Sequence, residues 1–266
     1  MTAKLITRFG PGVRAWIDAL PALVDTLAGR WDLEPVRPLP GGTSHTLLCR
    51  RGGGPVVLKL TPDPEIARQE LDALRAWEPS PRMVRVLDSD LDRGALLLEG
   101  LEPGTPATYD PLRMAELLDA LHVAPRGDFP TLAQRVDFVF ALLARRRPGD
   151  YSAGHAAAAE LARDDVRPTL LHGDLHLDNV LDAGGRGLVA IDPRPCIGDP
   201  ASDAADFAYA APDLRSGIEA LSGAVDGDRL AAWCAAFADF FPDRREEARS
   251  LGRPRRGRRS SDGVSG

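Results

Sequence analysis

The chain has 266 residues, of which 44% are hydrophobic and 27% charged, and its formal net charge is −6. This length and hydrophobic content suffice for one large domain or two lobes with a buried core, and they exclude a largely disordered protein. Residues 1–10 lack the apolar centre of a secretory signal, and no run reaches the roughly 18 apolar residues of a membrane span, so we expect a cytoplasmic protein without a membrane partner.

Residues 31–99 form short extended segments that are broken by turn residues. Alternating or β-branched stretches predict strands at 33–39, 46–50, 56–60, 83–88 and 95–99. Between the third and fourth of these, Asp63 can cap a helix that begins at Pro64 and continues through Trp77 with apolar residues at helical spacing. The pattern therefore predicts a sheet of about five strands with one helix.

After Gly100 the pattern changes to long helical periodicities. These predict helices at 112–121, 132–146, 155–163 and 230–240. The segment 101–106 is short and rich in helix breakers, which makes it the natural junction. We therefore predict an α+β fold with a small, mostly β lobe over residues 1–101 and a larger, mostly α lobe over 102–243.

Residues 244–266 differ from the rest of the chain in composition. They carry eight arginines against three acidic residues, so their charge is +5 and that of the remaining chain is −11. This composition predicts a disordered basic end. No aromatic residue lies among the arginines to stack on a base, and the acidic body attracts cations, so we expect no nucleic-acid partner.

An uncommon set of polar residues lies between short apolar strands of the second lobe. The strands are predicted at 169–171, 180–181 and 188–191. Asp174 lies in the first loop, Asn179, the only asparagine of the chain, ends that loop, and Asp192 follows the last strand. The glycine-rich turn at 182–187 would fold Asp192 back beside Asn179. This layout is typical of phosphoryl transfer, in which one acid accepts a hydroxyl proton and two oxygen ligands hold Mg²⁺.

Lys59 is one of only two lysines and lies inside an apolar predicted strand. A buried ammonium without a partner costs several kcal/mol, so the position needs an explanation. One is an exposed site on an edge strand. The other is a phosphate contact, with Glu70 of the following helix as the partner that holds the ammonium and Glu65 as the competitor for that role.

The loop between the first two predicted strands is a second candidate for phosphate binding. Its residues Gly41, Gly42, Thr43 and Ser44 could place backbone N–H groups over phosphates, because glycine permits close approach. The loop lacks the Gly-x-Gly-x-x-Gly spacing of protein kinases, and an ordinary hairpin loop explains it equally well.

The polar segments 170–179, 188–193 and 197–203, taken together, resemble the aminoglycoside/hydroxyurea phosphotransferase family. Further similarity lies at 14–24, 31–33, 58–60 and 74–77, so the resemblance covers roughly residues 14–240. It implies a protein-kinase-like two-lobe fold with ATP bound in the cleft. Residues 1–101 would form the nucleotide-binding lobe, and 102–243 the catalytic and acceptor-binding lobe.

The resemblance also implies roles for individual residues. Asp174 is implied as the catalytic base, and Asn179 and Asp192 as the ligands of Mg²⁺. Lys59 is implied as the contact to the α- and β-phosphates, with Glu70 bracing it. Further implied residues are Glu99, Gly100 and Leu101 in a hinge that contacts adenine, and His172 and Asp203 in support of the catalytic loop.

The acceptor implied by the family is a hydroxyl of a small cationic antibiotic, such as a streptomycin-like aminoglycoside. We expect Asp199 and Asp206, acidic residues near the predicted cleft, to meet its guanidinium or ammonium groups.

Three alternatives stay open. The same chemistry could act on hydroxyurea or a metabolite alcohol. A metallohydrolase could instead gather His172, Asp174 and His176 around a metal. Finally, the chain could bind a nucleotide or drug without turnover, because relatives carry further helices where this sequence has its arginine-rich end.

Overall fold

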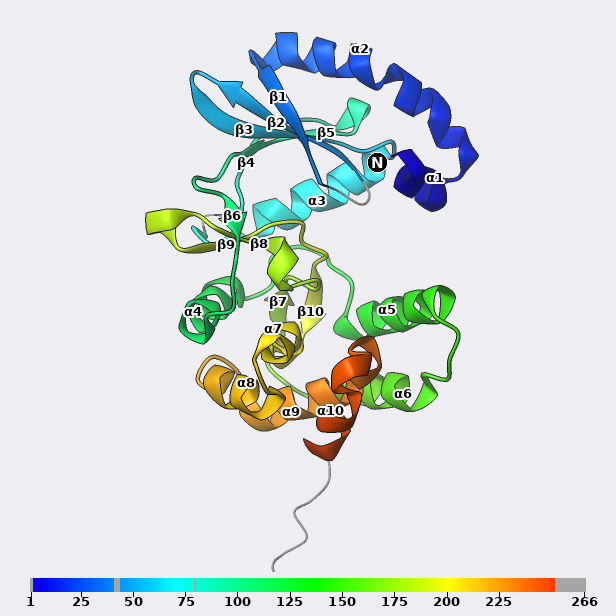
Figure 1. The fold of residues 1–266 in the computed structure, drawn as a ribbon, viewed down its shortest axis with the longest axis vertical. Coiled ribbons are helices and arrows are strands. Elements are labelled where there is room, and N and C mark those ends of the chain that lie inside the picture. The colour runs from blue at the N-terminus through cyan, green and yellow to red at the C-terminus, as the bar shows by residue number, and fades with distance from the viewer. Residues whose placement is uncertain (1, 41–43, 79, 252–266) are drawn as a thin grey trace, which may run out of the picture.

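The computed structural model describes residues 2–40, 44–78 and 80–251 of the chain. It has a lobe built around a β-sheet and a second, mostly helical lobe (Figure 1). The predicted α+β fold with two lobes is confirmed.

The first lobe contains a five-stranded antiparallel sheet in the order β1-β2-β3-β5-β4. Its strands are β1 (Glu34–Leu39), β2 (His45–Arg51), β3 (Gly54–Leu60), β4 (Val86–Asp90) and β5 (Ala95–Glu99). Its helices are α1 (Thr2–Phe9), α2 (Arg14–Trp31) and α3 (Pro64–Ala76). All five predicted strands are present, but β4 begins at Val86 rather than Met83, because Met83 forms an isolated bridge with Ala190 of the second lobe.

Helix α2 covers one face of this sheet (Figure 1). Its residues Leu20, Leu27 and Trp31 are buried in one cluster with Leu58 of β3. Because successive side chains of a strand point to opposite faces, Lys59 lies on the other face, toward α3. Helices α1 and α2 were not predicted from the sequence, although the apolar residues of α2 follow helical spacing.

The second lobe contains the helices α4 to α10 and two small sheets, β10-β7 and β6-β8-β9 (Figure 1). The helices are α4 (Pro111–Leu121), α5 (Leu132–Arg146), α6 (Ser152–Leu161), α7 (Ala205–Ala210), α8 (Leu214–Leu221), α9 (Gly227–Ala236) and α10 (Arg245–Leu251). The strands are β6 (Thr105–Pro106), β7 (Thr169–Leu171), β8 (Val180–Asp182), β9 (Leu188–Ala190) and β10 (Cys196–Gly198). The helix predicted at 132–146 is α5 without a shift, whereas α6 and α9 begin and end a few residues earlier than predicted.

Helix α10 corrects the expectation that the chain is disordered from residue 244 onward. Ala248 of this helix is fully buried. Arg245 and Arg249 bind the buried carboxylate of Asp239 at 3.0 and 3.1 Å, and these pairs fix the helix against the lobe. The prediction of disorder rested on the composition of residues 244–266 and left out Asp239, which precedes this segment. For residues 252–266, which lie outside the described part of the chain, disorder stays a prediction.

The larger hydrophobic core spans both lobes. It includes Leu74 and Trp77 from α3 and its C-terminal end, together with Leu117 and Leu121 from α4. The Trp77 indole N–H donates to the Leu121 carbonyl at 2.8 Å, which joins the two lobes.

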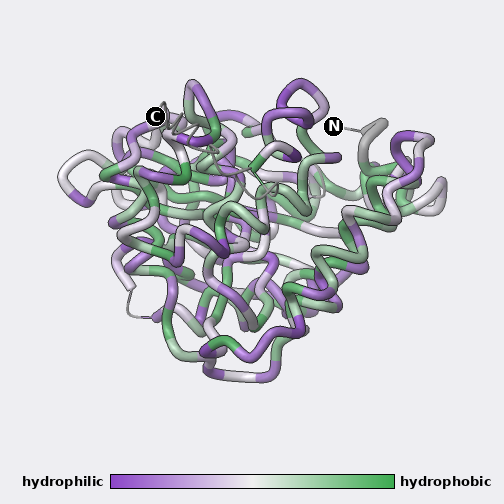
Figure 2. Tube along the Cα trace, turned by 90° about the horizontal axis from the view of Figure 1, so that it is seen from below, coloured by the Kyte–Doolittle hydropathy of each residue, from purple (hydrophilic) through white to green (hydrophobic). Residues whose placement is uncertain are grey.

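Figure 2 shows hydrophobic and hydrophilic segments alternating along the chain. None of the described helices is long and apolar enough to cross a membrane.

The β8–β9 hairpin is hydrogen-bonded to two other parts of the chain. On one side, β8 pairs with β6, the short strand just after the junction between the lobes. On the other side, the Ala190 N–H donates to the Arg82 carbonyl at 2.8 Å and the Val84 N–H donates to the Ala190 carbonyl at 3.0 Å. This hairpin positions the candidate site that follows.

Candidate active site

Lys59 lies in the middle of the first-lobe sheet, because β3 pairs with β2 on one side and β5 on the other. It is only 7% exposed, so the edge-strand alternative is wrong. Its ammonium donates to Glu70 of α3 at 2.6 Å and also binds Asp192 of the second lobe. Burial alone would lower the pKa of Lys59, but the two carboxylates outweigh burial and raise that pKa. The ammonium is therefore held in its charged form.

Glu70, and not Glu65, is the partner of Lys59. Glu70 is 4% exposed and faces the sheet, as expected from its place beside the apolar positions of α3. Glu65 lies in the first turn of α3, is exposed, and pairs with Arg68 and Gln69 of the same helix. The buried pair of Lys59 and Glu70 joins β3 to α3, and the same Lys59 ammonium reaches Asp192 of the second lobe.

The loop after β7 is held from beneath by Asp203. Its carboxylate accepts the backbone N–H of His172 at 2.6 Å and that of Gly173 at 2.9 Å. Burial would raise the pKa of Asp203, but these bonds and the nearby imidazole of His122 lower it. Gly173 has φ 74°, and a Cβ there would lie 2.1 Å from the Arg194 carbonyl oxygen. The turn before Asp174 therefore requires glycine.

His172 is fully buried and both of its ring nitrogens are engaged. Nε2 donates to the Ile191 carbonyl at 2.9 Å, and Nδ1 accepts the Asp174 backbone N–H at 3.3 Å. Burial lowers the pKa of His172, so the ring is neutral. No nitrogen of this ring is left to bind a metal, which argues against the metallohydrolase alternative. Among the described residues there is also no cluster of three or more metal-ligating side chains.

Asp174 presents its carboxylate to an open space. The side chain is 42% exposed, and Oδ1 accepts a bond from the Arg135 guanidinium at 3.1 Å. Arg135 also donates to the Gly173 carbonyl at 2.8 Å, so it fixes both backbone and side chain of the loop. The Asn179 amide nitrogen donates to the Asp174 carbonyl at 2.9 Å and lies 3.5 Å from its Oδ2. The carboxylate is oriented but accessible.

The β8–β9 hairpin brings Asp192 back beside Asn179, as its turn predicted. Val180 pairs with Ala190, and the Ile191 N–H donates to the Asn179 carbonyl at 2.9 Å. Asp192 has φ 57°, an uncommon conformation for a residue other than glycine. Burial would raise the pKa of its carboxyl, but Lys59 outweighs burial and lowers it. One carboxylate and one amide suit Mg²⁺, which takes few protein ligands and fills its shell with phosphate oxygens and water.

The predicted hinge lies where β5 ends. The Glu99 carboxylate is bound by Arg85 at 2.8 Å and by Arg186 at 2.6 Å, and these partners lower its pKa despite burial. The Glu99 side chain is thus used within the protein. Gly100 donates to the Pro55 carbonyl at 3.1 Å, and a Cβ on it would lie 2.6 Å from Pro55, so the two strands meet closely there. Leu101, the third residue of the predicted hinge, is partly buried against the larger core.

The glycine-rich loop can be placed only in part. Gly41, Gly42 and Thr43 lie outside the described residues. Ser44 is buried, and it lines a small cavity together with Lys59 and Glu70. The C-terminal end of this loop therefore lies beside the lysine, as a phosphate-binding loop requires.

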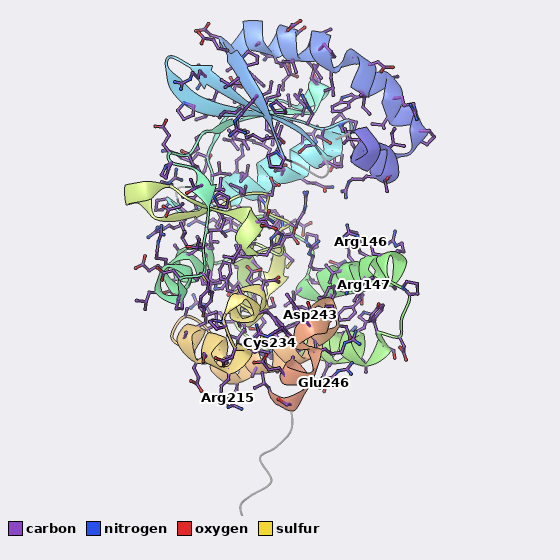
Figure 3. All side chains as sticks on the ribbon, viewed as in Figure 1. Arg146, Arg147, Arg215, Cys234, Asp243 and Glu246 are labelled. Carbon is purple, nitrogen blue, oxygen red and sulfur yellow. The ribbon has the colours of Figure 1, made fainter. Side chains whose placement is uncertain are left out.

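A cavity of about 830 Å³ opens in front of Asp174, between α1 of the first lobe and the helices of the second. Its acidic residues are Asp174, Asp203 and Asp206, and its aromatic residues are Phe138, Phe237, Phe240 and Phe241. Five arginines also line it: Arg8, Arg135, Arg146, Arg147 and Arg194. In Figure 3, Arg146 lies on the edge of α5 that faces the first lobe. The wall thus mixes aromatic surface with both signs of charge.

The two acids expected to meet the acceptor have different surroundings. Asp206 lines the cavity, and burial beside Asp174 and Asp203 raises its pKa to about 7. Asp199 is 2% exposed, lines no part of the cavity, and accepts bonds from Arg229 and Trp233, each at 2.6 Å. Its carboxylate is fully used within the helical lobe, so the expectation that Asp199 contacts a ligand is wrong.

Two residues of this site, Arg135 and Arg194, were not predicted from the sequence. Arg135 is far from Asp174 in sequence, and nothing in its neighbourhood on α5 distinguishes it from the other arginines of that helix. Arg194 could have been found, because it follows Asp192 by two residues. Both line the cavity with Asp174.

Comparison with known proteins agrees with this geometry. The family model for aminoglycoside/hydroxyurea antibiotic resistance kinases matches residues 30–244. Streptomycin 6-kinase of Streptomyces griseus is 33% identical over 82% of this chain and 74% of its own length. Hydroxyurea phosphotransferase of Kitasatospora aureofaciens is 31% identical over 84% of this chain and 72% of its own length.

Solved structures show the same fold. Choline kinase LicA of Streptococcus pneumoniae superposes with a TM-score of 0.65 at 15% identity, covering 88% of this chain and 98% of that one. The fold is therefore that of protein-kinase-like phosphotransferases. With the family match extending over both lobes, the chain belongs to the aminoglycoside/hydroxyurea antibiotic resistance kinase family.

Proposed function

We propose that this protein transfers the γ-phosphoryl group of ATP to a hydroxyl of a streptomycin-like aminoglycoside. The observation that carries the proposal is a chain of contacts that joins Lys59 to Asp192 and Asn179 to Asp174, with the hairpin holding Asp192 beside Asn179. Asp174 in turn lines a cavity large enough for a drug-sized acceptor. The named relatives, which are kinases of streptomycin and of hydroxyurea, support the same reaction type.

In this proposal the first lobe holds the nucleotide. The backbone of 99–101 meets the adenine, and Lys59, kept charged by Glu70, contacts the α- and β-phosphates. Asp192 and Asn179 would hold Mg²⁺, which supplies charge neutralisation to the phosphates when bound. Bound phosphates would share the Lys59 ammonium with its present carboxylate partners.

Asp174 orients the acceptor hydroxyl and takes its proton as the oxygen attacks phosphorus. The carboxylate is suited to this role because Arg135 and the Asn179 amide fix its position while it stays accessible. Most of the rate enhancement would come from positioning and from charge neutralisation, since phosphoryl transfer needs little covalent participation by the protein.

The cavity in front of Asp174 would bind the acceptor. Its aromatic wall offers apolar contact area, and Asp206 offers a carboxylate to an ammonium or guanidinium group. An aminoglycoside requires both, because its sugar rings present apolar faces as well as charge.

Hydroxyurea is a second candidate acceptor, and one specific observation favours it. Five arginines line the cavity against three acids, and this excess of positive charge suits a small neutral acceptor better than a polycation. A relative that is 31% identical is named a hydroxyurea phosphotransferase.

A panel of acceptors tests the proposal. ADP release would be measured with streptomycin, other aminoglycosides, hydroxyurea and simple alcohols, and each product would be identified by mass. We expect phosphorylation of a streptomycin-like drug. Transfer to hydroxyurea alone would select the second candidate. Binding of ATP with Mg²⁺, without transfer to any acceptor, would leave a binding protein and refute the enzymatic proposal.

A further inference from the structure

One guanidinium lines the cavity in front of Asp174, and neither the proposed reaction nor the family resemblance gives it a role. It belongs to Arg194, in the segment that follows β9. This segment leaves the hairpin at Asp192, passes through Pro193 and enters β10 at Cys196.

The backbone of Arg194 is fixed against the catalytic loop. Its N–H donates to the His172 carbonyl at 2.8 Å. Its carbonyl oxygen packs so closely against Gly173 that a Cβ added there would lie only 2.1 Å from this oxygen. Because Asp203 holds the same two residues from the other side, the Cα of Arg194 has little freedom relative to Asp174. A side chain on this backbone therefore starts from a fixed point in the site.

The side chain of Arg194 lies near both functional acids. It lines the cavity together with Asp174, and it is one of the cations that lower the pKa of Asp192. A phosphoryl group passing from a nucleotide held by Lys59 and Asp192 to a hydroxyl held by Asp174 must cross the space between these acids. Arg194 shares the cavity with Asp174 and acts electrostatically on Asp192, so it is near both ends of this transfer.

Other cations near the site differ from Arg194 in what holds them. Lys59 is bound to Glu70 and Asp192, and Arg135 is bound to Gly173 and Asp174. Arg8 and Arg146, which also line the cavity, belong to exposed positions on α1 and at the end of α5. Neither has a backbone anchored to the catalytic loop among the described contacts.

We propose that Arg194 is a catalytic residue whose guanidinium contacts the equatorial oxygens of the γ-phosphoryl group during its transfer. The inference rests on the proposed kinase function. Negative charge on these oxygens must be neutralised while the bond to ADP breaks and the bond to the acceptor oxygen forms. A planar guanidinium can donate two parallel N–H bonds to such oxygens, which a lysine ammonium cannot do in the same geometry.

The test compares Arg194→Gln and Arg194→Lys with Arg145→Gln, a matched control on α5. The Arg145 side chain bonds only to Ala141 of its own helix among the described contacts, and it does not line the cavity. Two quantities would be measured on the full chain. One is ATP turnover with the best acceptor and with water. The other is the Kd of Mg·ADP by calorimetry, with and without aluminium fluoride, which mimics the transferring phosphoryl group.

We expect Arg194→Gln to lower kcat by about 1,000-fold or more, the lower end of the range for arginines that neutralise this transition state. The KM for ATP and the Kd of Mg·ADP should stay close to the wild-type values. The tightening of ADP binding by aluminium fluoride should be lost in Arg194→Gln and partly kept in Arg194→Lys. Arg145→Gln should match wild type in every measurement.

Two results would overturn the assignment. If Arg194→Gln keeps the wild-type response to aluminium fluoride, Arg194 does not contact the transferring group. If it loses thermal stability and Mg·ADP affinity together, its role is structural. A wild-type protein that does not bind Mg·ADP would refute the proposed function itself, and the inference with it, whereas normal wild-type binding with an unaffected Arg194→Gln refutes this inference alone.

Discussion

Lys59 of the first lobe forms a salt bridge with Asp192 of the second, and the same ammonium binds Glu70 at 2.6 Å. Replacing Lys59 with methionine removes the charge and leaves Glu70 buried without a partner. We expect a loss of about 3 to 5 kcal/mol of unfolding free energy, the usual consequence of breaking a buried pair. Urea unfolding measures this loss.

The double variant Lys59→Met, Glu70→Leu separates stability from activity. It removes both buried charges, so most of the lost stability should return. Phosphoryl transfer should stay reduced by about 100-fold or more, because no cation then faces the phosphates. Recovery of activity along with stability would show that Lys59 acts only as a structural residue.

Asp174→Ala tests the proposed base. We expect turnover to fall by about 100- to 10,000-fold, the range for a missing general base, with an unchanged unfolding transition. Asp178→Asn is the control, since Asp178 lies in the same loop but is exposed. It should behave as wild type. Full activity in Asp174→Ala would refute the assignment.

Gly173→Ala tests whether the catalytic loop requires its left-handed turn. An L-residue at φ 74° is strained by about 1 to 3 kcal/mol, and the new Cβ would also collide with the Arg194 carbonyl. We expect lower stability and a loss of activity. Gly223→Ala has open space and no such backbone conformation, so its stability should lie within about 0.5 kcal/mol of wild type. Equal effects at both positions would contradict the structure.

Asp206 should make stability depend on pH. Its pKa is raised from 3.8 to about 7 in the folded protein by burial and by Asp174 and Asp203. The stability that protonated Asp206 contributes is therefore present below pH 3.8 and is lost as the pH rises toward 7. We expect the stability advantage of Asp206→Asn over wild type to grow by about 2 kcal/mol between pH 5 and 8. Urea titrations at several pH values measure it, and a constant difference would refute the shift.

The same titration should affect acceptor binding. Ionised Asp206 attracts a cation, so the KM of a cationic acceptor should fall as the pH rises through about 7. The KM of neutral hydroxyurea should not follow this curve. In Asp206→Asn the KM of the cationic acceptor should lose this pH dependence, and an unchanged profile would show that Asp206 does not contact the acceptor.

The parts of the site that depend on local sequence were predictable. The pairing of Lys59 with Glu70 follows from an ammonium on an apolar strand and an acid on the buried face of the next helix. The meeting of Asn179 and Asp192 follows from a single hairpin. In both cases a short connection leaves few possible arrangements, so alternation and turn chemistry determine which side chains meet.

The parts that depend on distant packing were not predictable. Asp199 meets Arg229 and Trp233 because η5, the turn at Pro200–Ser202, packs against α9, which no local pattern indicates. The fixing of Asp174 by Arg135 likewise depends on how α5 docks beside the catalytic loop. In α10, the buried acid Asp239 offsets the charge that made the segment look disordered.

The backbone pairing of Ala190 with Arg82 and Val84 limits how the molecule can open. The strand that carries Ala190 ends just before Asp192, so the segment between α3 and β4 is tied directly to the magnesium-binding candidate. A rigid-body swing of one lobe away from the other must either break these two bonds or carry the hairpin with it. In the proposed function, a nucleotide would therefore have to enter and leave without separating the hairpin from the segment at Arg82 and Val84.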